Sequence, residues 1–315
     1  MDNLTFGIKY TPFRSREGGL CRLVASIRVR YPQPLLVASN GQALPLCCAL
    51  QAARHVRSAL GLSAGRNALA RATTTEFLMV LDDDVLFTDQ TDVQRLVSHV
   101  ATRGVHVAAA CYSGIPPTSW AFKFGNECAA GWFRTAETMP DRAILYTPTG
   151  VNAMHKYKGL ERAHVVQNAF VARAHWLRQH RWDARLQTAE DTLWFYQRHK
   201  QKDSIAFDKE VQVEHSGNKS QSGDYNRRST RYQEAHFLQW MCKAEPTIKF
   251  WLLPFWSLDC RTRMLKRRFP VGYAPKNVWA QQQMLPQALA WTKELCEPNP
   301  FAVRKKGVQV CGASH

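Results

Sequence analysis

The sequence predicts an α/β protein whose central sheet is mostly parallel and flanked by helices, because two observations agree. Short apolar runs alternate with segments of helical periodicity over roughly the first 110 residues. One of these runs, Phe77 to Leu81, ends directly in three consecutive aspartates. Unpaired carboxylates are costly in a core, so this strand must leave the sheet there and present them at its carboxyl end. At 315 residues, the chain can form one large domain or one domain with an appendage.

The individual elements are expected in the following order. Leu4 to Tyr10 is a first strand, and the apolar residues from Leu20 to Ile27 then lie at helical spacing. Further strands are expected at Leu35 to Ala38, Phe77 to Leu81, Val105 to Cys111, Val165 to Ala172 and Ile205 to His215. Further helices are expected at Asn67 to Ala72, Val93 to Val100, Ala174 to His180, Thr192 to Lys200 and Arg227 to Cys242.

Two segments between these elements are expected to be irregular. Ser113 to Gly150 contains a double proline and scattered glycines, which indicate a long substrate-side insertion, and Ser216 to Asp224 has the composition of a mobile loop. After about Glu245 the sequence is basic, aromatic and proline-punctuated, and no fold is predicted for it. The expected division is therefore a catalytic domain over residues 1–245 and a basic C-terminal extension over residues 246–315.

Charge and cysteine content limit the class of partner. The formal net charge of +17 favours acidic partners such as nucleotide phosphates, anionic glycans, nucleic acid or a membrane surface. No RNP, KH, zinc-finger or helix-turn-helix signature supports nucleic acid. The nine cysteines contain no C-x-x-C pair. No signal peptide or bilayer-spanning run is visible, so the sequence predicts a soluble, cytoplasmic chain without a membrane-spanning segment.

The aspartate triplet is the strongest candidate for a functional site. Asp82 and Asp84 are two residues apart, so on an extended backbone their side chains point to the same side. Two carboxylates on one side suit Mg²⁺ or Mn²⁺, which bind a few carboxylates together with substrate phosphates. The alternative is an acidic turn that simply follows a core strand, and the triplet by itself favours neither.

Four segments, in this order and spacing, resemble inverting glycosyltransferases of the GT-A fold, and most closely the β-1,4-N-acetylgalactosaminyltransferases. They are Cys21 to Pro32, Gly61 to Asn67, Phe77 to Thr88 and Val166 to Arg173. The resemblance implies a Rossmann-like catalytic domain, a UDP-sugar donor that is usually UDP-GalNAc, a divalent cation (Mn²⁺ or Mg²⁺), and a glycan or glycoconjugate acceptor, which the basic charge allows to be acidic. It also implies the Golgi lumen, where close relatives sit behind a membrane anchor that this chain lacks.

The chain departs from the family at one donor-binding position. Where many relatives place an acidic residue after the second strand to hold the uracil, this chain has Ser39 and Asn40. The identity of the donor is therefore less certain than the reaction class.

The resemblance also suggests roles for individual residues. Asp82, Asp84 and His215 are the expected metal ligands, and Asp83 is expected to contact sugar or ribose hydroxyls. A histidine at a strand end such as His215 is equally compatible with a plain surface position. Asp191 is the expected general base, because related enzymes carry a Glu-Asp pair at the matching place, with Glu190 as the substitute. The alternative for this pair is helix capping.

Other residues are candidates for donor binding. Arg66 can offer its planar guanidinium to a phosphate, or it can form an internal salt bridge that stabilises the aspartate strand. Asn168, inside an apolar run, can contact a sugar or satisfy a neighbouring backbone group. Lys219 lies in the basic loop expected to fold over the diphosphate. Trp120, Trp132 and Trp194 are possible stacking platforms for a sugar, although most tryptophans are core residues.

The sequence thus predicts a metal-dependent inverting glycosyltransferase that moves GalNAc or another hexosamine from a UDP-sugar to a glycan hydroxyl. Two alternatives remain open. One is a polyanion- or nucleic-acid-binding protein, suggested by the charge. The other is a catalytically inactive relative that still binds sugar nucleotides.

Overall fold

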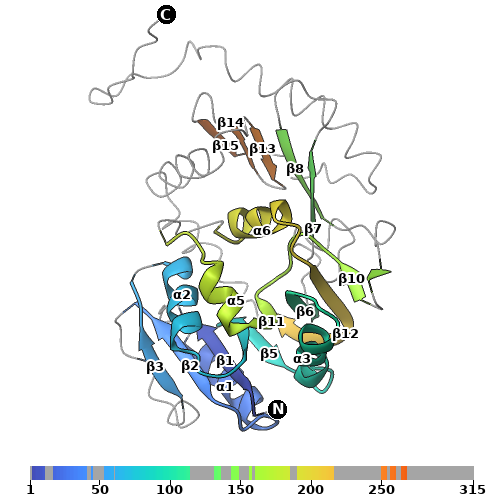
Figure 1. Ribbon diagram of the computed structural model, residues 1–315. Coiled ribbons are helices and arrows are strands. Elements are labelled where there is room, and N and C mark those ends of the chain that lie inside the picture. Colours follow the sequence, from blue (N-terminus) through green and yellow to red (C-terminus); the bar gives the residue numbers. More distant parts are fainter. Residues whose placement is uncertain are drawn as a thin grey trace, which may run out of the picture.

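A computed structural model of the chain describes thirteen stretches of it, and these hold the whole aspartate strand and its neighbours (Figure 1). The described residues are 2–10, 17–40, 44, 53–59, 61–113, 131–135, 143–148, 156–157, 160–184, 190–215, 250–253, 256–259 and 264–267, of which the stretches 131–157 and 250–267 are described by their backbone only. The expected helix at 227–242, the loop at 216–224 with Lys219, and Trp120 lie outside these residues.

The main sheet has ten strands in the order β3-β2-β1-β4-β11-β6-β12-β10-β9, with β5 paired to β12. The strands are β1 (Leu4–Lys9), β2 (Leu35–Ser39), β3 (Arg54–Arg57), β4 (Phe77–Asp82), β5 (Val85–Phe87), β6 (Val107–Ser113), β9 (Lys156–Tyr157), β10 (Leu160–Arg162), β11 (Ala169–Arg173) and β12 (Ile205–His215). From β3 to β4 all neighbours are parallel, as the alternation of strand and helix predicted. β11 runs antiparallel to both β4 and β6, which makes the whole sheet mixed.

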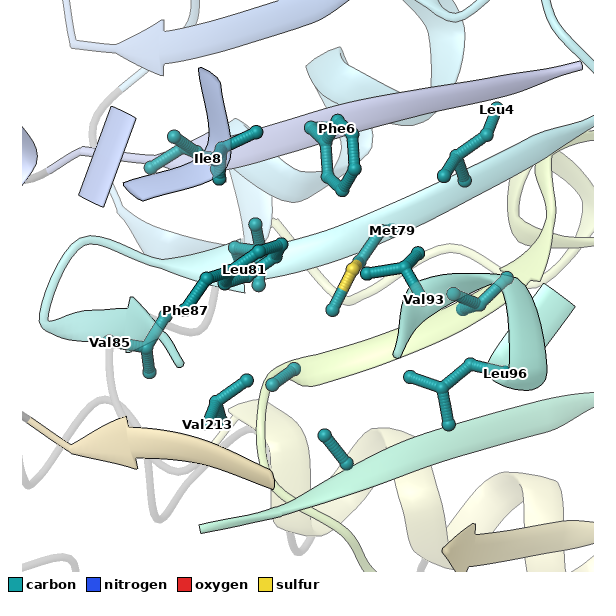
Figure 2. Close-up of a cluster of buried hydrophobic side chains, with 14 of the residues drawn as sticks. Leu4, Phe6, Ile8, Met79, Leu81, Val85, Phe87, Val93, Leu96 and Val213 are labelled. Atoms are coloured by element: carbon teal, nitrogen blue, oxygen red, sulfur yellow. The ribbon is translucent and has the colours of Figure 1, made fainter. Parts of the chain in front are cut away.

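Helices cover both faces of this sheet. α1 (Glu17–Arg28) and α3 (Val93–Thr102) pack on one face, and α2 (Leu62–Ala72), α5 (Ala174–Gln179) and α6 (Glu190–Lys200) pack on the other. β4 supplies both faces in alternation, since Leu78 and Val80 belong to one buried cluster and Met79 and Leu81 to the other. Figure 2 shows the second cluster, in which side chains of β1 and β4 lie together with those of α3.

Several elements differ from their expected bounds. α2 begins at Leu62, five residues before the expected start, because its first turns bury small and polar side chains that carry no apolar periodicity. β11 begins at Ala169, so the expected strand start at Val165 is wrong. The expectation of an irregular insertion at 113–150 is also wrong in part, since β7 (Gly131–Thr135) and β8 (Ala143–Pro148) lie within it.

A second sheet joins segments that are distant in sequence. Its order is β15-β14-β13-β8-β7, with β13 (Phe250–Leu253), β14 (Trp256–Asp259) and β15 (Met264–Arg267). β13 pairs in parallel with β8, so strands from both sides of position 245 share one sheet.

Cys21 and Cys111 are each disulfide-bonded. Among the described residues, no helix combines the length and apolar character needed to cross a bilayer.

Candidate functional site

The acidic cluster lies where β4 leaves the sheet. Asp82 is the last residue of this strand, and Asp83 and Asp84 form the turn into β5. Asp83 is buried, whereas the side chains of Asp82 and Asp84 are each 28% exposed. The core strand therefore delivers two accessible carboxylates to the carboxyl edge of the parallel part of the sheet, which is the usual ligand edge of such folds.

His215 lies next to this turn because of strand pairing. β12 runs antiparallel to β5 with His215 opposite Val85, and this register places Nε2 of His215 3.6 Å from Oδ2 of Asp84. The imidazole also stacks on Tyr112 at the end of β6, with ring centroids 5.5 Å apart. The structure thus brings together Asp84 and His215, which are 131 positions apart in the printed sequence (215 − 84).

Arg66 occupies the centre of the acidic cluster. Its side chain is only 1% exposed, and Nη2 donates to Oδ1 of Asp82 at 2.9 Å. Nη1 donates to Oε1 of Glu190 at 2.6 Å and to Oδ1 of Asp191 at 2.7 Å. One guanidinium from α2 therefore connects the end of β4 to the first turn of α6. Of the two roles considered for Arg66, this arrangement matches the internal salt bridge, since both Nη atoms are engaged by carboxylates.

Two further side chains complete this network. Nδ2 of Asn168 donates to Oδ2 of Asp82 at 3.0 Å and to Oδ2 of Asp191 at 2.9 Å. Nε1 of Trp182 donates to Oδ1 of Asp191 at 3.2 Å. Trp182 is itself fixed, because Asn67 bonds its backbone N–H at 3.0 Å and its carbonyl at 2.7 Å. The adjacent residues Arg66 and Asn67 thus orient Asp191 from two sides.

Trp194 does not serve as an accessible sugar platform. Its side chain is buried and stacks on Trp182, with ring centroids 4.4 Å apart and an interplanar angle of 11°. Nε1 of Trp194 donates to the carbonyl of His180 at 2.6 Å. The suggested stacking role is therefore wrong for Trp194, which supports the indole of Trp182 from inside the core. Trp132 lies on β7, and its side chain is outside the described part of the structure.

Lys9 is a buried cation at this site that the sequence reasoning missed. It ends β1 opposite Asp82, is 3% exposed, and its Nζ donates to the carbonyl of Tyr10 at 2.8 Å. Gly65 leaves room for it, since a Cβ at that position would lie 2.1 Å from Cδ of Lys9. Burial lowers the pKa of Lys9 to about 8, against the opposing effect of Asp83. A charged residue within an apolar strand was the available signal for Lys9, whereas nothing local marks Trp182.

The pKa values of the carboxyl groups depend on their burial and on the charges around them. Burial and the charge of Asp191 together raise the pKa of Glu190 to about 8, although Arg66 opposes both effects. Burial also raises the pKa of Asp82, and the charge of Asp84 adds to this increase while Arg66 again opposes it. More negative charge is gathered here than one guanidinium neutralises, so a proton on Glu190 relieves the excess.

The raised pKa of Glu190 predicts a pH-dependent stability. The unfolded chain releases the proton of Glu190 near the ordinary pKa of 4.5, whereas the folded state keeps it until about pH 8. The free energy of unfolding should therefore fall as pH rises through this window, by about 1.4 kcal/mol per pH unit from this group. Glu190→Gln should remove that slope. Urea unfolding across the same window measures it, with Glu210→Gln, at a side chain 76% exposed, as the control that keeps the slope. Equal slopes in wild type and Glu190→Gln would contradict the assignment.

A divalent cation is compatible with this donor set. Asp84 and His215 offer a carboxylate and an imidazole beside the turn, with Nε2 of His215 3.6 Å from Oδ2 of Asp84. Within the described residues, no group of three or more acidic, histidine or cysteine side chains is arranged to hold an ion. An ion here would thus complete its coordination with diphosphate oxygens and water, which is the usual habit of Mg²⁺.

Comparison with known proteins agrees with this architecture. Residues 52–162, which include the aspartate strand, match the profile of Glycosyl transferase family 2. The structure resembles the mannosyltransferase PcManGT from Pyrobaculum calidifontis in complex with GDP-Man and Mn²⁺, with a TM-score of 0.50 and 13% identity, over 95% of this chain and 76% of that one. It also resembles S. aureus TarS, residues 1–349, with a TM-score of 0.43 and 13% identity, over 78% of this chain and 73% of that one.

No curated protein matches the sequence. The first of the two structural likenesses supports the fold that the four sequence segments implied, and the profile match covers the strand that carries the acidic cluster. The fold and the family profile together identify the chain as a glycosyltransferase with a GT-A fold.

Proposed function

We propose that this glycosyltransferase is a metal-dependent, inverting enzyme that moves GalNAc or another hexosamine from a UDP-sugar to a hydroxyl of a glycan or glycoconjugate. The observation that carries this proposal is the convergence of two acidic motifs on Arg66. Asp82 comes from the strand expected to face the donor, and Asp191 comes from the helix expected to supply the base. An inverting transfer needs a leaving diphosphate and a base on opposite sides of the sugar. The contacts of Arg66 with both Asp82 and Asp191 support a site in which the donor-side carboxylate and the proposed base lie close together.

Asp191 is suited to act as the general base. Oδ1 already accepts hydrogen bonds from Arg66 and Trp182, whereas Oδ2 accepts one, from Asn168. A carboxylate oxygen has two lone pairs, so Oδ2 keeps one for the proton of the acceptor hydroxyl. The side chain is 27% exposed, which leaves it within reach of an acceptor. Glu190 is 3% exposed and has a raised pKa, so it is the weaker candidate for this step.

Asp84 and His215 are the residues that we propose to hold the cation. Both oxygens of Asp82 already accept hydrogen bonds, from Arg66 and Asn168, and Nε2 of His215 lies 3.6 Å from Oδ2 of Asp84 beside the same turn. When bound, a divalent ion neutralises charge on the departing diphosphate. Asp82 keeps its predicted role as a further ligand only if its oxygens accept the ion in addition to these two hydrogen bonds.

The basic composition of the chain and the lack of an acidic residue directly after β2 bear on which sugar nucleotide the enzyme binds. Oγ of Ser39 lies 2.8 Å from Nε2 of His55, so this polar pair stands where many relatives place an acidic residue for the uracil. A donor screen must therefore include a guanosine sugar nucleotide beside the uridine ones.

The test is nucleotide release from UDP-GalNAc, UDP-GlcNAc, UDP-Gal and GDP-Man, with Mn²⁺ or with EDTA, in the presence of simple aryl glycosides as acceptors. We expect release that requires both the ion and one UDP-hexosamine, and a product of inverted anomeric configuration by NMR. Asp84→Asn should lose the response to Mn²⁺, whereas Asp89→Asn, at a side chain 97% exposed, should not. Release that is unaffected by EDTA, or a product of retained configuration, would contradict the proposal.

A further inference from the structure

The carboxamide of Asn168 has a fixed orientation. The residue is 4% exposed, and its backbone carbonyl accepts a hydrogen bond from the N–H of Asp82 at 3.2 Å. The two N–H groups of Nδ2 serve Oδ2 of Asp82 and Oδ2 of Asp191. A flipped amide would place its oxygen against both carboxylates, so only the observed orientation is stable.

This orientation leaves the carbonyl oxygen of Asn168 without a partner. Oδ1 is buried and makes no hydrogen bond within the part of the chain that the structure describes. Buried amide oxygens are normally paired, because losing water without gaining a donor costs free energy, and an exception in a functional site calls for an explanation. The unpaired atom belongs to a side chain that, like Arg66, bridges the acidic strand end and the candidate base.

We propose that Oδ1 of Asn168 accepts a hydrogen bond from a hydroxyl or an acetamido N–H of the transferred sugar, and so determines which sugar is accepted. This inference rests on the proposed function. Asp82 is on the donor side and Asp191 on the base side, and the transferred sugar is the group that lies between leaving diphosphate and attacking hydroxyl. A diphosphate oxygen cannot satisfy Oδ1, because both are acceptors at neutral pH.

A second unpaired atom suggests an alternative explanation for the unpaired oxygen of Asn168. Nε of Arg66 is also buried without a hydrogen-bond partner, and it is a donor. A single buried water that bonds both Nε of Arg66 and Oδ1 of Asn168 would satisfy the two atoms without any sugar. In that case Asn168 would orient Asp191 but would not discriminate between donor sugars.

The experiment compares discrimination between donors. The value of kcat/KM is measured for the donor that wild type accepts and for its monodeoxy analogues, in wild type, Asn168→Ala and Trp182→Phe. Removing one particular sugar group should lower kcat/KM of wild type by about 10-fold or more, since a site built to bond a group rejects substrates lacking it. In Asn168→Ala the same removal should cost less than about 3-fold. The ratio of kcat/KM between the donor and its deoxy analogue is informative, because a misplaced base lowers kcat/KM equally for both.

Trp182→Phe is the matched control. It removes a hydrogen bond to Asp191 while leaving Asn168 in place, so it should lower kcat but keep the full discrimination. Where Asn168→Ala turns over too slowly, competition binding of the same analogues against UDP gives the ratio without catalysis, and Asn168→Ser provides a second variant. The inference would be overturned if Asn168→Ala and Asn168→Ser discriminated between donors as wild type does. A donor complex with a water between Asn168 and Arg66 would also overturn it.

The two proposals fail in different ways. If wild type releases no nucleotide from any donor tested, the proposed function fails and the role of Asn168 fails with it. If wild type is active but treats every monodeoxy analogue alike in all variants, only the role of Asn168 is refuted.

Discussion

Replacing Asp191 by asparagine is expected to lower kcat by about 10²–10⁴-fold, the usual contribution of a positioned general base. Asparagine keeps the size of the side chain and an oxygen for Arg66 and Trp182, but its amide nitrogen cannot accept the proton of the acceptor hydroxyl. The KM for the donor should change far less than kcat, because proton transfer is lost outright, whereas the donor is affected only through the orientation that Oδ2 of Asp191 gives to Asn168. Steady-state kinetics with saturating Mn²⁺, together with the binding affinity for UDP, measure both quantities.

Asp92→Asn is the matched control for this prediction. Asp92 also stands at a helix start, where its side chain caps α3 by accepting the N–H of Arg95, and asparagine is an equally good cap. It contacts none of the site residues named above, so kcat should remain that of wild type. Near-normal turnover of Asp191→Asn at wild-type thermal stability would remove Asp191 from the role of base and leave Glu190 to be tested.

Replacing Arg66 by methionine is expected to destabilise the fold by about 3–5 kcal/mol, the usual cost of removing one partner of a buried ion pair. The change would leave Glu190 buried without its cation, and it would separate the end of β4 from the start of α6. Urea unfolding at neutral pH measures the loss. When unfolding is repeated above about pH 8, adding Glu190→Gln should recover part of the loss, because Glu190 would otherwise carry a buried negative charge there.

Arg71→Met on the same helix controls for helix propensity. Arg71 is exposed, and arginine and methionine have similar propensities, so the change should alter stability by less than about 0.5 kcal/mol. If Arg66→Met were as stable as wild type, the salt bridges would not hold the site together. If Glu190→Gln failed to restore any stability to Arg66→Met, the excess of negative charge would not be the cause of the loss.

Much of this site could be anticipated from local patterns. The apolar run before Asp82 predicted where the acidic turn would stand, whereas α6 begins at Glu190, two residues before its expected start at Thr192. The alternating pattern from Ile205 to His215 gave the bounds of β12 without error. These features depend on residues close together in the chain, for which periodicity and charge are sufficient signals. The roles of Lys219 and Asp83 stay predictions.

The relative positions of these motifs could not be anticipated from the chain. The sequence by itself determined an α/β domain with an acidic strand end and a basic overall charge. Only the tertiary structure showed that the guanidinium of Arg66 joins Asp82 to Asp191, that the pairing of β12 with β5 is what brings His215 to Asp84, and that Trp182 joins the site. The physical reason is that strand register and helix packing bring together residues more than a hundred positions apart, and neither leaves a local pattern in the sequence.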